Sequence, residues 1–392
     1  MFRKKREKTC SETLLVEQDT SLSVSVGVEE LPLEEILVAS QWKLMWWKFK
    51  KHKLAVFSGI VLIILYVVGA FCEFLSPYDP NEYRTRYAFA PPQLIRFVGE
   101  EGFSFRPFVY GYKSSINRET LRREYTIDKD QVYPIKFFVR GEPYKFWGIW
   151  ETDIRFIGTE GGVLFLLGTD RLGRDVLSRI LYGARISLSV GLFGVFLSLV
   201  LGIIIGGLSG YFGGTIDMIV QRLIEFLRCI PTIPLWMALS AALPAQWPPL
   251  RVYFGVTIIL SLIGWTGLAR VVRSKFLSLR EEEFVLAARL AGAGRMRIIV
   301  RHMVPSFLSH IIASITLAIP NMILGETSLS FLGVGLRPPV ISWGVLLKEA
   351  QNVRTIALTP WLLVPGVFVI VAVLAFNFLG DGLRDAADPY VR

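Results

Sequence analysis

Charged side chains within or beside apolar stretches are the residues of this sequence best placed to do chemistry. Glu326 stands alone in the apolar stretch 307–332. Because a charge that faces lipid is costly, we expect its carboxyl group to face other helices and to find a partner there. Structural bonding within a helix bundle and lining of a transport pathway are both open for this residue.

Asp170, Arg174 and Asp175 form a second charged group, just before another apolar stretch. They can be a solvated rim whose charges pair with one another, or they can line the mouth or gate of a pathway. Together with Glu326 they are the candidates for a pathway or gate.

The sequence lacks the motifs of common catalytic, nucleotide and metal sites. It has no Gly-x-x-x-x-Gly-Lys-Ser/Thr, so the chain cannot cradle nucleotide phosphates by the P-loop route. His-Glu-x-x-His and nucleophile-elbow motifs are also missing. The histidines and cysteines are scattered, which predicts packing or surface roles and no metal site, for His52, His302, His310, Cys10, Cys72 and Cys229. We therefore expect the chain not to be an enzyme.

The polar loop 273–305 has the clearest local organisation. Ser278 and Glu281 fit a capping box, which predicts a helix over 279–291. Gly292 is well placed to end that helix, and a second helical stretch then leads into the membrane. The first helix is too short to span a bilayer, and its alanines would let another surface approach closely. Lipid and a protein partner are both open as that surface.

Apolar helices must position these residues. Hydrophobic residues make up 52% of the 392 residues and charged residues only 19%, and several runs reach the about 20 apolar residues that cross a bilayer. We predict an all-α integral membrane protein with six transmembrane helices. These spans are 54–75, 186–211, 216–243, 252–272, 307–332 and 361–379.

The span 216–243 is less regular than the others. Pro231 and Pro234 should bend it. Charged residues in its first half are spaced to pair along one helix face, namely Asp217, Arg222, Glu225 and Arg228.

Residues 76–180 differ from the rest in being charged, aromatic and broken by Pro and Gly. Alternating runs such as 135–140 predict strands, so we expect a small β-rich insert. The chain then divides into a cytoplasmic tail (1–53), a first span (54–75), this extracytoplasmic insert and a five-helix core (181–392).

The formal charge of +10 is best explained by a basic cytoplasmic side, and we expect no nucleic-acid partner. The 273–305 loop holds seven Lys and Arg residues, whereas the 244–250 loop holds none. This asymmetry predicts cytoplasmic N- and C-termini. The tail ends in a basic and aromatic stretch rich in Trp and Lys over 42–53, which is typical of a flank that contacts membrane lipid. No cleavable signal peptide is expected, because the first apolar run starts only near Leu54.

Residues 283–292, continued to Pro305, resemble the "EAA" loop of binding-protein-dependent ABC permeases. In that family the loop is a coupling helix that sits in a groove of the ATPase subunit. The resemblance implies that ATPase coupling rests on Glu282, Glu283, Phe284, Ala287, Ala288, Arg289, Gly292 and Pro305. Leu286 replaces the glutamate that gives the motif its name, so the polar contact of that glutamate is not carried over.

Further segments are similar to the "C" subunit side of the dipeptide/oligopeptide permease subfamily. They are 167–179, 182–187, 210–214, 326–333, 342–344 and 377–385. With the first span, these matches cover nearly everything from residue 167 onward, whereas the insert resembles nothing recognised.

The resemblance implies a type I ABC importer permease in the inner membrane that carries di- or oligopeptides, although relatives also carry oligosaccharides or nickel. It implies a second homologous permease, two ATPase subunits that hold ATP and Mg, and an extracytoplasmic solute-binding protein. No cofactor is expected in this chain.

Two other function classes stay open on the residues alone. An ion-coupled secondary transporter would work through Asp217, Glu225 or Glu326 and would need no ATPase partner. A membrane-anchored enzyme or receptor would use the insert as its active part, although no catalytic constellation is visible there.

Overall fold

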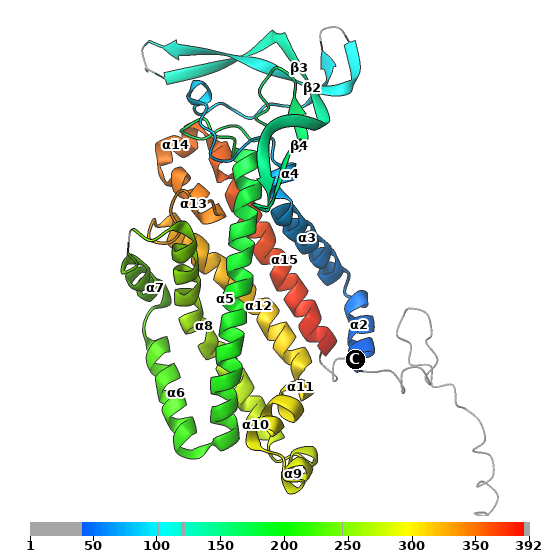
Figure 1. Ribbon diagram of the computed structural model, residues 1–392, viewed down its shortest axis with the longest axis vertical. Helices are drawn as coiled ribbons and strands as arrows, with labels where there is room; N and C mark the ends of the chain where they lie inside the picture. Colours follow the sequence, from blue (N-terminus) through cyan, green and yellow to red (C-terminus); the bar gives the residue numbers. More distant parts are fainter. Residues whose placement is uncertain (1–40, 100–101, 119–121, 245, 388–392) are drawn as a thin grey trace, which may run out of the picture. The chain divides into compact units, whose positions relative to one another are not determined.

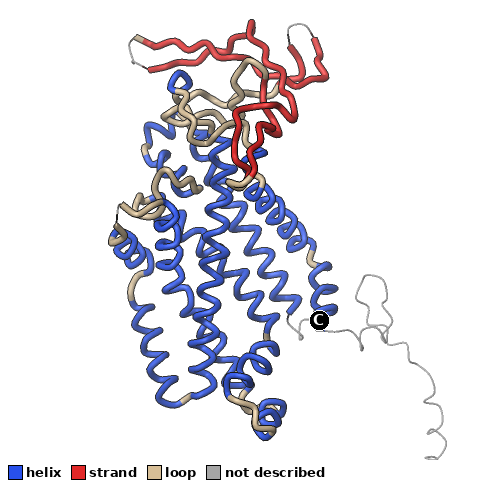
Figure 2. The backbone as a smooth tube through the Cα atoms, in the orientation of Figure 1, coloured by secondary structure: helices blue, strands red, loops and turns tan. Residues whose placement is uncertain are grey.

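A computed structural model describes residues 41–99, 102–118, 122–244 and 246–387 of the chain. The predicted tail up to residue 40, with Cys10, and the last residues of the predicted cytoplasmic C-terminus, 388–392, lie outside the described residues. The chain divides into two units between residues 44 and 45, and the second unit, residues 45–392, is compact. Helix α2 (Gln41–Lys51) lies across this boundary. The second unit holds the other described elements, which are long helices with a β insert at one end of them (Figures 1 and 2).

Among the described residues, five helices are long and apolar enough to cross a membrane. Such helices suit a bilayer because their backbone hydrogen bonds stay within the segment. They are α3 (Lys53–Ala70), α5 (Val176–Phe212), α8 (Pro249–Leu279), α12 (Leu308–Phe331) and α15 (Val364–Ala387), the last preceded directly by η4 (Pro360–Leu363). Each overlaps a predicted span. Helices α5, α8 and α15 extend beyond the predicted ends, and α3 stops at Ala70, short of the predicted end at residue 75.

The predicted bend at the prolines is confirmed. Helices α6 (Gly214–Cys229) and α7 (Thr232–Ala241) meet at an angle of 85°. Pro231 lacks a backbone N–H and disfavours a helical Ile230, which has extended ψ of 129°. The number of spans is six only if this bent pair counts as one span.

The loop after α8 differs from the prediction at its start. Ser278 is no N-cap, because α8 continues to Leu279 and the Arg280 amide donates to the Phe276 carbonyl oxygen at 3.0 Å. The Ser278 hydroxyl donates to a carbonyl of its own helix instead, at 3.0 Å from the Lys275 oxygen. Short helical elements follow, namely α9 (Glu283–Leu290), α10 (Arg295–Arg297), the π-helical η2 (Ile298–Met303) and α11 (Val304–Ser306).

The predicted β-rich insert is confirmed. Its described residues form four antiparallel strands in the order β1-β2-β3-β4. They are β1 (Arg96–Gly99), β2 (Gly102–Asn117), β3 (Arg122–Phe146) and β4 (Trp150–Thr159). Ile135, in the run expected to form a strand, pairs with Thr159. Its side chain joins Val109 and Leu164 in a small buried core.

Short helices surround the same end of the long helices. They are α4 (Cys72–Leu75), η1 (Thr85–Tyr87), α13 (Trp343–Lys348), η3 (Glu349–Gln351) and α14 (Val353–Leu358). Trp343 is fully buried, and it joins the main core with side chains of α5, α12 and α15. The α13 segment is thereby held against the long helices.

Glycines on α5 let its backbone lie directly on α8. A Cβ on Gly206 would lie 2.4 Å from the Ala269 carbonyl oxygen, and one on Gly210 would lie 2.8 Å from the Arg273 carbonyl oxygen. Both contacts are closer than any side chain tolerates. Small residues at such crossings are a common way for membrane helices to pack.

Candidate functional site

The first candidate site is α9, at the opposite end of the long helices from the β insert (Figure 1). Val285 is fully buried and belongs to an apolar cluster with Phe276, Ile298 and Met303. The other side of the helix is exposed, and Leu290 is 90% exposed. One side chain therefore anchors the helix, and the rest of it presents a mixed apolar and charged face.

Most of the predicted coupling residues gather on this element. Glu282, Glu283, Phe284, Ala287 and Arg289 are exposed, and Ala288 is half-buried against the Val285 cluster. Gly292 follows the end of the helix with a φ of +78°, as predicted for a glycine that terminates it.

Two further positions complete this region. Pro305 is separate, because it lies in α11, where it is exposed. Leu286, in place of the family glutamate, is 40% exposed and so lies on the open side of α9.

An ion pair ties α6 to α8 near this end. Asp217 accepts hydrogen bonds from the Nε and Nη2 atoms of Arg273 and from the Ser209 hydroxyl. The expected pairing along α6 is found for Arg222 and Glu225, whose atoms lie 2.8 Å apart in an exposed position. The partner of Asp217 was missed, since it lies on another helix.

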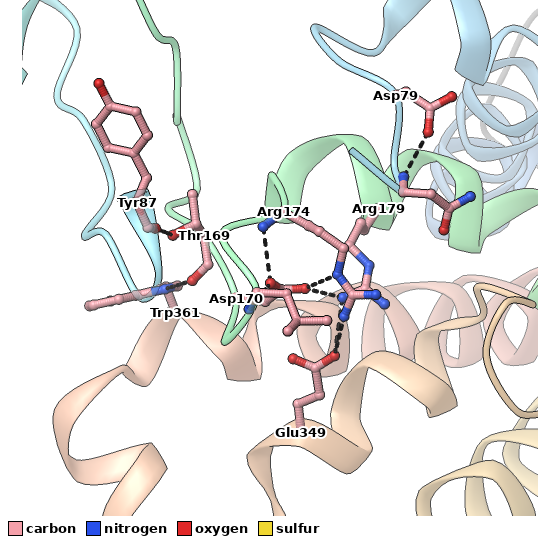
Figure 3. Close-up of polar contacts among 10 residues, drawn as sticks. Asp79, Tyr87, Thr169, Asp170, Arg174, Arg179, Glu349 and Trp361 are labelled. Carbon is pink, nitrogen blue, oxygen red and sulfur yellow. Dashed lines mark hydrogen bonds and ion pairs between the residues drawn. The ribbon is translucent and has the colours of Figure 1, made fainter. Parts of the chain in front are cut away.

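The second candidate site is a charge cluster at the insert end (Figure 3). Arg174 Nε lies 2.6 Å from Asp170 Oδ2, and Arg179 Nη1 also donates to Asp170. Glu349 of η3 accepts from both guanidinium groups, at 2.9 Å from Arg174 and 3.1 Å from Arg179. Two acids and two arginines therefore balance, and they join residues 170–179 to a segment 170 residues further on.

The prediction of a solvated rim is wrong for this cluster. Asp170 is 1% exposed, Arg174 7% and Arg179 2%. The mutual pairing of Asp170 with Arg174 is found as expected. The cluster is buried because it lies in the turn before α5, and η3 covers this turn. Trp361 also contacts the turn, where its Nε1 donates to the Thr169 carbonyl oxygen at 3.0 Å.

Asp175 takes no part in that pairing and instead caps α5. Its Oδ2 accepts from the Ser178 amide at 2.7 Å and from the Ser178 hydroxyl at 2.6 Å. A carboxylate suits this place because the first amides of a helix lack partners within it. Burial nevertheless raises the pKa of Asp175 to about 6, against the lowering effect of the Ser178 hydrogen bonds.

Glu326 faces the bundle interior and has partners, as expected. It is fully buried, and its Oε1 accepts from the hydroxyls of Ser330 and Ser342, each at 2.7 Å. Ser187 of α5 donates to Oε2 at 3.3 Å. The carboxyl group thus joins α12 to α5 and to the start of α13, a geometry that favours structural bonding.

An open cavity of about 480 Å³ lies between α5, the start of α8 and residues 339–341. Its lining includes Asp79, Tyr182, Arg185, Leu250 and Tyr253. Arg185 also donates to the Glu73 carboxylate, with Nη1 2.6 Å from Oε1. The cavity therefore combines apolar walls with charged groups of both signs at its edge.

Comparison of the amino-acid sequence with known proteins identifies the family of this chain. The oligopeptide transport system permease protein OppC of Haemophilus influenzae is 43% identical over 223 residues, which are 57% of this chain and 69% of that protein. The chain belongs to the family of binding-protein-dependent transport system inner membrane components. The sequence profile with this description matches residues 198–392, and that of the N-terminal transmembrane domain of oligopeptide transport permease C matches residues 40–92.

Two other proteins are similar to this permease. The dipeptide transport system permease protein DppC of Bacillus subtilis is 41% identical over 57% of this chain and 68% of its own length. A solved structure, described as inward facing conformations of the MetNI methionine ABC transporter, aligns with a TM-score of 0.41 and 18% identity, over 53% of this chain and 96% of that chain.

The two family profiles divide the permease in an informative way. The C-terminal profile includes α9, the bent pair α6 and α7, and Glu326. The interval between the profiles holds all four strands and the segment with Asp170, Arg174 and Asp175. The strands of the insert therefore lie outside both family profiles.

Sequence reasoning missed several residues of these sites. Glu349 gave no signal, because it lies in a short loop far from Asp170 in the chain. Arg185 and Arg273 did offer one, since an arginine at the edge of an apolar stretch calls for a partner. The structure supplies Glu73 and Asp217 as those partners.

Proposed function

We propose that this permease is one subunit of an ABC importer in the inner membrane and that it carries di- or oligopeptides. The chain would pair with a second homologous permease, two ATPase subunits and an extracytoplasmic solute-binding protein. ATP and Mg would bind on the ATPase subunits, and this chain would hold no cofactor of its own. The relatives named for oligopeptide and dipeptide transport support this cargo over oligosaccharides or nickel.

The observation that carries the proposal is the exposed side of α9. A helix of 8 residues cannot span a bilayer, yet α9 is fixed to α8 and η2 through the buried Val285. Exposed Leu290 and the small Ala287 leave room for a partner to approach closely. A docking ATPase would cover this apolar area, which water disfavours.

The orientation that we propose puts α9 in the cytoplasm and the insert outside. Basic residues concentrate at the α9 end, where Arg280, Arg289, Arg295 and Arg297 lie beside the membrane-spanning helices. This distribution follows the positive-inside pattern. The N- and C-termini would then both lie in the cytoplasm, with α9.

The test changes the docking face while leaving the buried anchor in place. Ala287→Arg puts a long charged side chain on the exposed side of α9, and Ala242→Arg is the matched control at an exposed alanine beyond the end of α7. We expect the first variant to lose co-purification with the ATPase subunits and ATP-dependent peptide uptake into proteoliposomes. The control should retain both.

Two results would contradict the proposal. If Ala287→Arg retained ATPase binding and uptake, α9 would not be the coupling element. If uptake ran on an ion gradient without ATP, the secondary-transporter alternative would hold. Competition of uptake by unlabelled peptides, oligosaccharides or nickel then identifies the cargo class.

A further inference from the structure

The hairpin of β3 and β4 ends beside the outer end of the first span. Its tip is Trp147, Gly148 and Ile149, between the paired residues Phe146 and Trp150. The Trp147 indole Nε1 donates to the Ala70 carbonyl oxygen at 2.7 Å, and Ala70 is the last residue of α3. The tip of the insert thus reaches back to the place where the span stops.

The length of α3 sets the depth of this contact. Its 18 residues rise by about 27 Å at 1.5 Å each, close to the about 30 Å of the hydrocarbon layer. Ala70 therefore lies at the boundary between acyl chains and headgroups. Tryptophan is enriched at that depth, because its ring is apolar and its N–H is polar.

The exposed surface of the tip continues the lipid-facing side of α3. Ile60, Ile64 and Val67 are exposed along one side of this span, and Phe71 follows them one turn later. The Phe71 ring lies 5.8 Å from that of Phe146 and 6.4 Å from that of Trp147. The apolar stripe therefore passes from the helix to the hairpin without a polar break.

The tip itself is apolar and open, and polar residues follow it directly. Ile149 is 68% exposed and Trp150 62%. One pair further from the tip, Lys145 and Glu151 face each other, with side-chain atoms 3.4 Å apart. An apolar end below a charged pair has the polarity order of a lipid interface, which runs from acyl chains to charged headgroups.

The packing of the insert fixes the direction of the hairpin. Phe74 of α4 contacts the rings of Phe138 and Phe156, at 6.0 Å and 5.8 Å between centroids. Arg155 is buried and donates Nη1 to the Ser76 carbonyl oxygen at 3.0 Å. Both contacts join the strands to the segment directly after the first span, so the tip cannot turn away without breaking them.

The turn at the hairpin tip contains a tryptophan in a backbone conformation that disfavours bulky residues. Trp147 has a φ of +50°, where a bulky side chain is uncommon and asparagine or glycine is usual. Its ring stacks on Phe146 with centroids 5.2 Å apart and is held by the bond to Ala70. A tryptophan at this position is thus explained by what its side chain contacts.

We propose that this hairpin tip inserts into the outer lipid interface and anchors the insert on the bilayer. Its ligand is the boundary of phospholipid headgroups and acyl chains beside α3. The insert then has a defined place on the membrane beside the end of α3. The hairpin tip lies in the interval between the two family profiles, residues 93–197.

The test places a nitroxide label at Ile149→Cys in the full-length permease, in phospholipid nanodiscs. Cys10→Ser and Cys229→Ser remove competing thiols, and Cys72 is buried. Phe105→Cys is the matched control, because Phe105 is 91% exposed in β2. The β1–β2 hairpin lies away from α3 (Figure 1).

We expect the ratio of collisions with oxygen to collisions with a water-soluble nickel chelate to be several-fold higher at 149 than at 105. A second labelled position, Trp150→Cys, should follow 149. Equal ratios at 149 and 105 would mean that the tip lies in water and would overturn the proposal. Protection of 149 from both colliders in the transporter assembled with its partner subunits would also overturn it, because a protein would then cover the tip.

Discussion

The charge cluster at the insert end makes Asp170→Ala an informative change. Asp170 is buried between two guanidinium groups, and it also accepts the amides of Leu172 and Arg174 at 2.8 Å and 3.0 Å. Removal of one partner from a buried ion pair costs about 3–5 kcal/mol, because the remaining charge stays buried without compensation. After the change, Arg174 and Arg179 would share Glu349 alone.

The exposed pair Arg222–Glu225 supplies the control. Its side chains are 79% and 57% exposed, so Glu225→Ala should cost about 0.5 kcal/mol or less. The assay is the Tm of the detergent-solubilised permease, followed by tryptophan fluorescence. We expect a clearly larger fall in Tm for Asp170→Ala than for Glu225→Ala.

A double-mutant cycle separates the charge pair from general packing. Asp170→Ala, Arg179→Ala and the double variant should show a coupling of at least about 1 kcal/mol, as contacting residues in one network do. Asp170→Asn keeps the volume and removes the charge, so it should resemble Asp170→Ala. The cluster would not be a stabilising ion network if Asp170→Ala lowered the Tm no more than Glu225→Ala, or if the coupling were absent.

Three further predictions concern the α9 end and the insert end of the long helices. Gly173→Ala should lower the Tm strongly, because φ is +77° and the new Cβ would lie 2.0 Å from the Arg84 carbonyl oxygen. Gly214 is the control, because its φ is +54° but no atom lies near its Cβ position. Gly214→Ala should lower the free energy of unfolding only by the about 1–2 kcal/mol that a left-handed backbone costs an alanine. Val285→Ala removes two methyl groups from a full cluster and should cost about 2 kcal/mol, seen as faster hydrogen exchange of the α9 amides with unchanged exchange in α12. Burial raises the pKa of Asp175 to about 6 from 3.8, so the folded state takes up a proton and gains stability as the pH falls through 6. The Tm should rise over that range, and Asp175→Asn, which keeps the cap, should abolish that part of the rise. If the variant kept the same dependence of Tm on pH, Asp175 would not be the group that titrates.

The long helices could be predicted because the signal for them is local. An uninterrupted apolar run of the right length has few alternatives to a spanning helix, and Pro231 marks the bend in the same local way. The predicted start of α9 was wrong because the signal for it was also local. Ser278 followed by Glu281 fits a cap equally well in any context, and only the continued hydrogen bonding of α8 decides against it.

The charge cluster at the insert end could be predicted only in part. The spacing of Asp170 and Arg174 allowed their pairing, but the burial depends on η3, which the chain reaches 170 residues later. Likewise, the alternating run around Ile135 predicted strands, but no local pattern gives the register that aligns Phe146 with Trp150. The contact of Trp147 with Ala70 follows from that register, so the sequence alone offered no route to it.

Helix α8 connects the α9 region with the cavity. It has 31 residues, a rise of about 46 Å, and it lines the cavity with Leu250 and Tyr253 near its start. Near its other end, Phe276 joins the cluster that holds Val285 of α9. A force that moves α9 therefore acts directly on the base of the helix that forms one wall of the cavity.

The packing of α5 on α8 determines how such a motion would spread. Gly206 and Gly210 bring the two backbones into direct contact, and the Asp217–Arg273 pair ties α6 to the same turn of α8. A close backbone contact leaves little room to slide, so α5 and α8 should move as one body. Since α5 carries Arg179 of the charge cluster and Tyr182 of the cavity lining near its start, displacement of α9 would reach the cluster and the cavity together. Through Glu349, the buried Asp170 network would link that movement to η3.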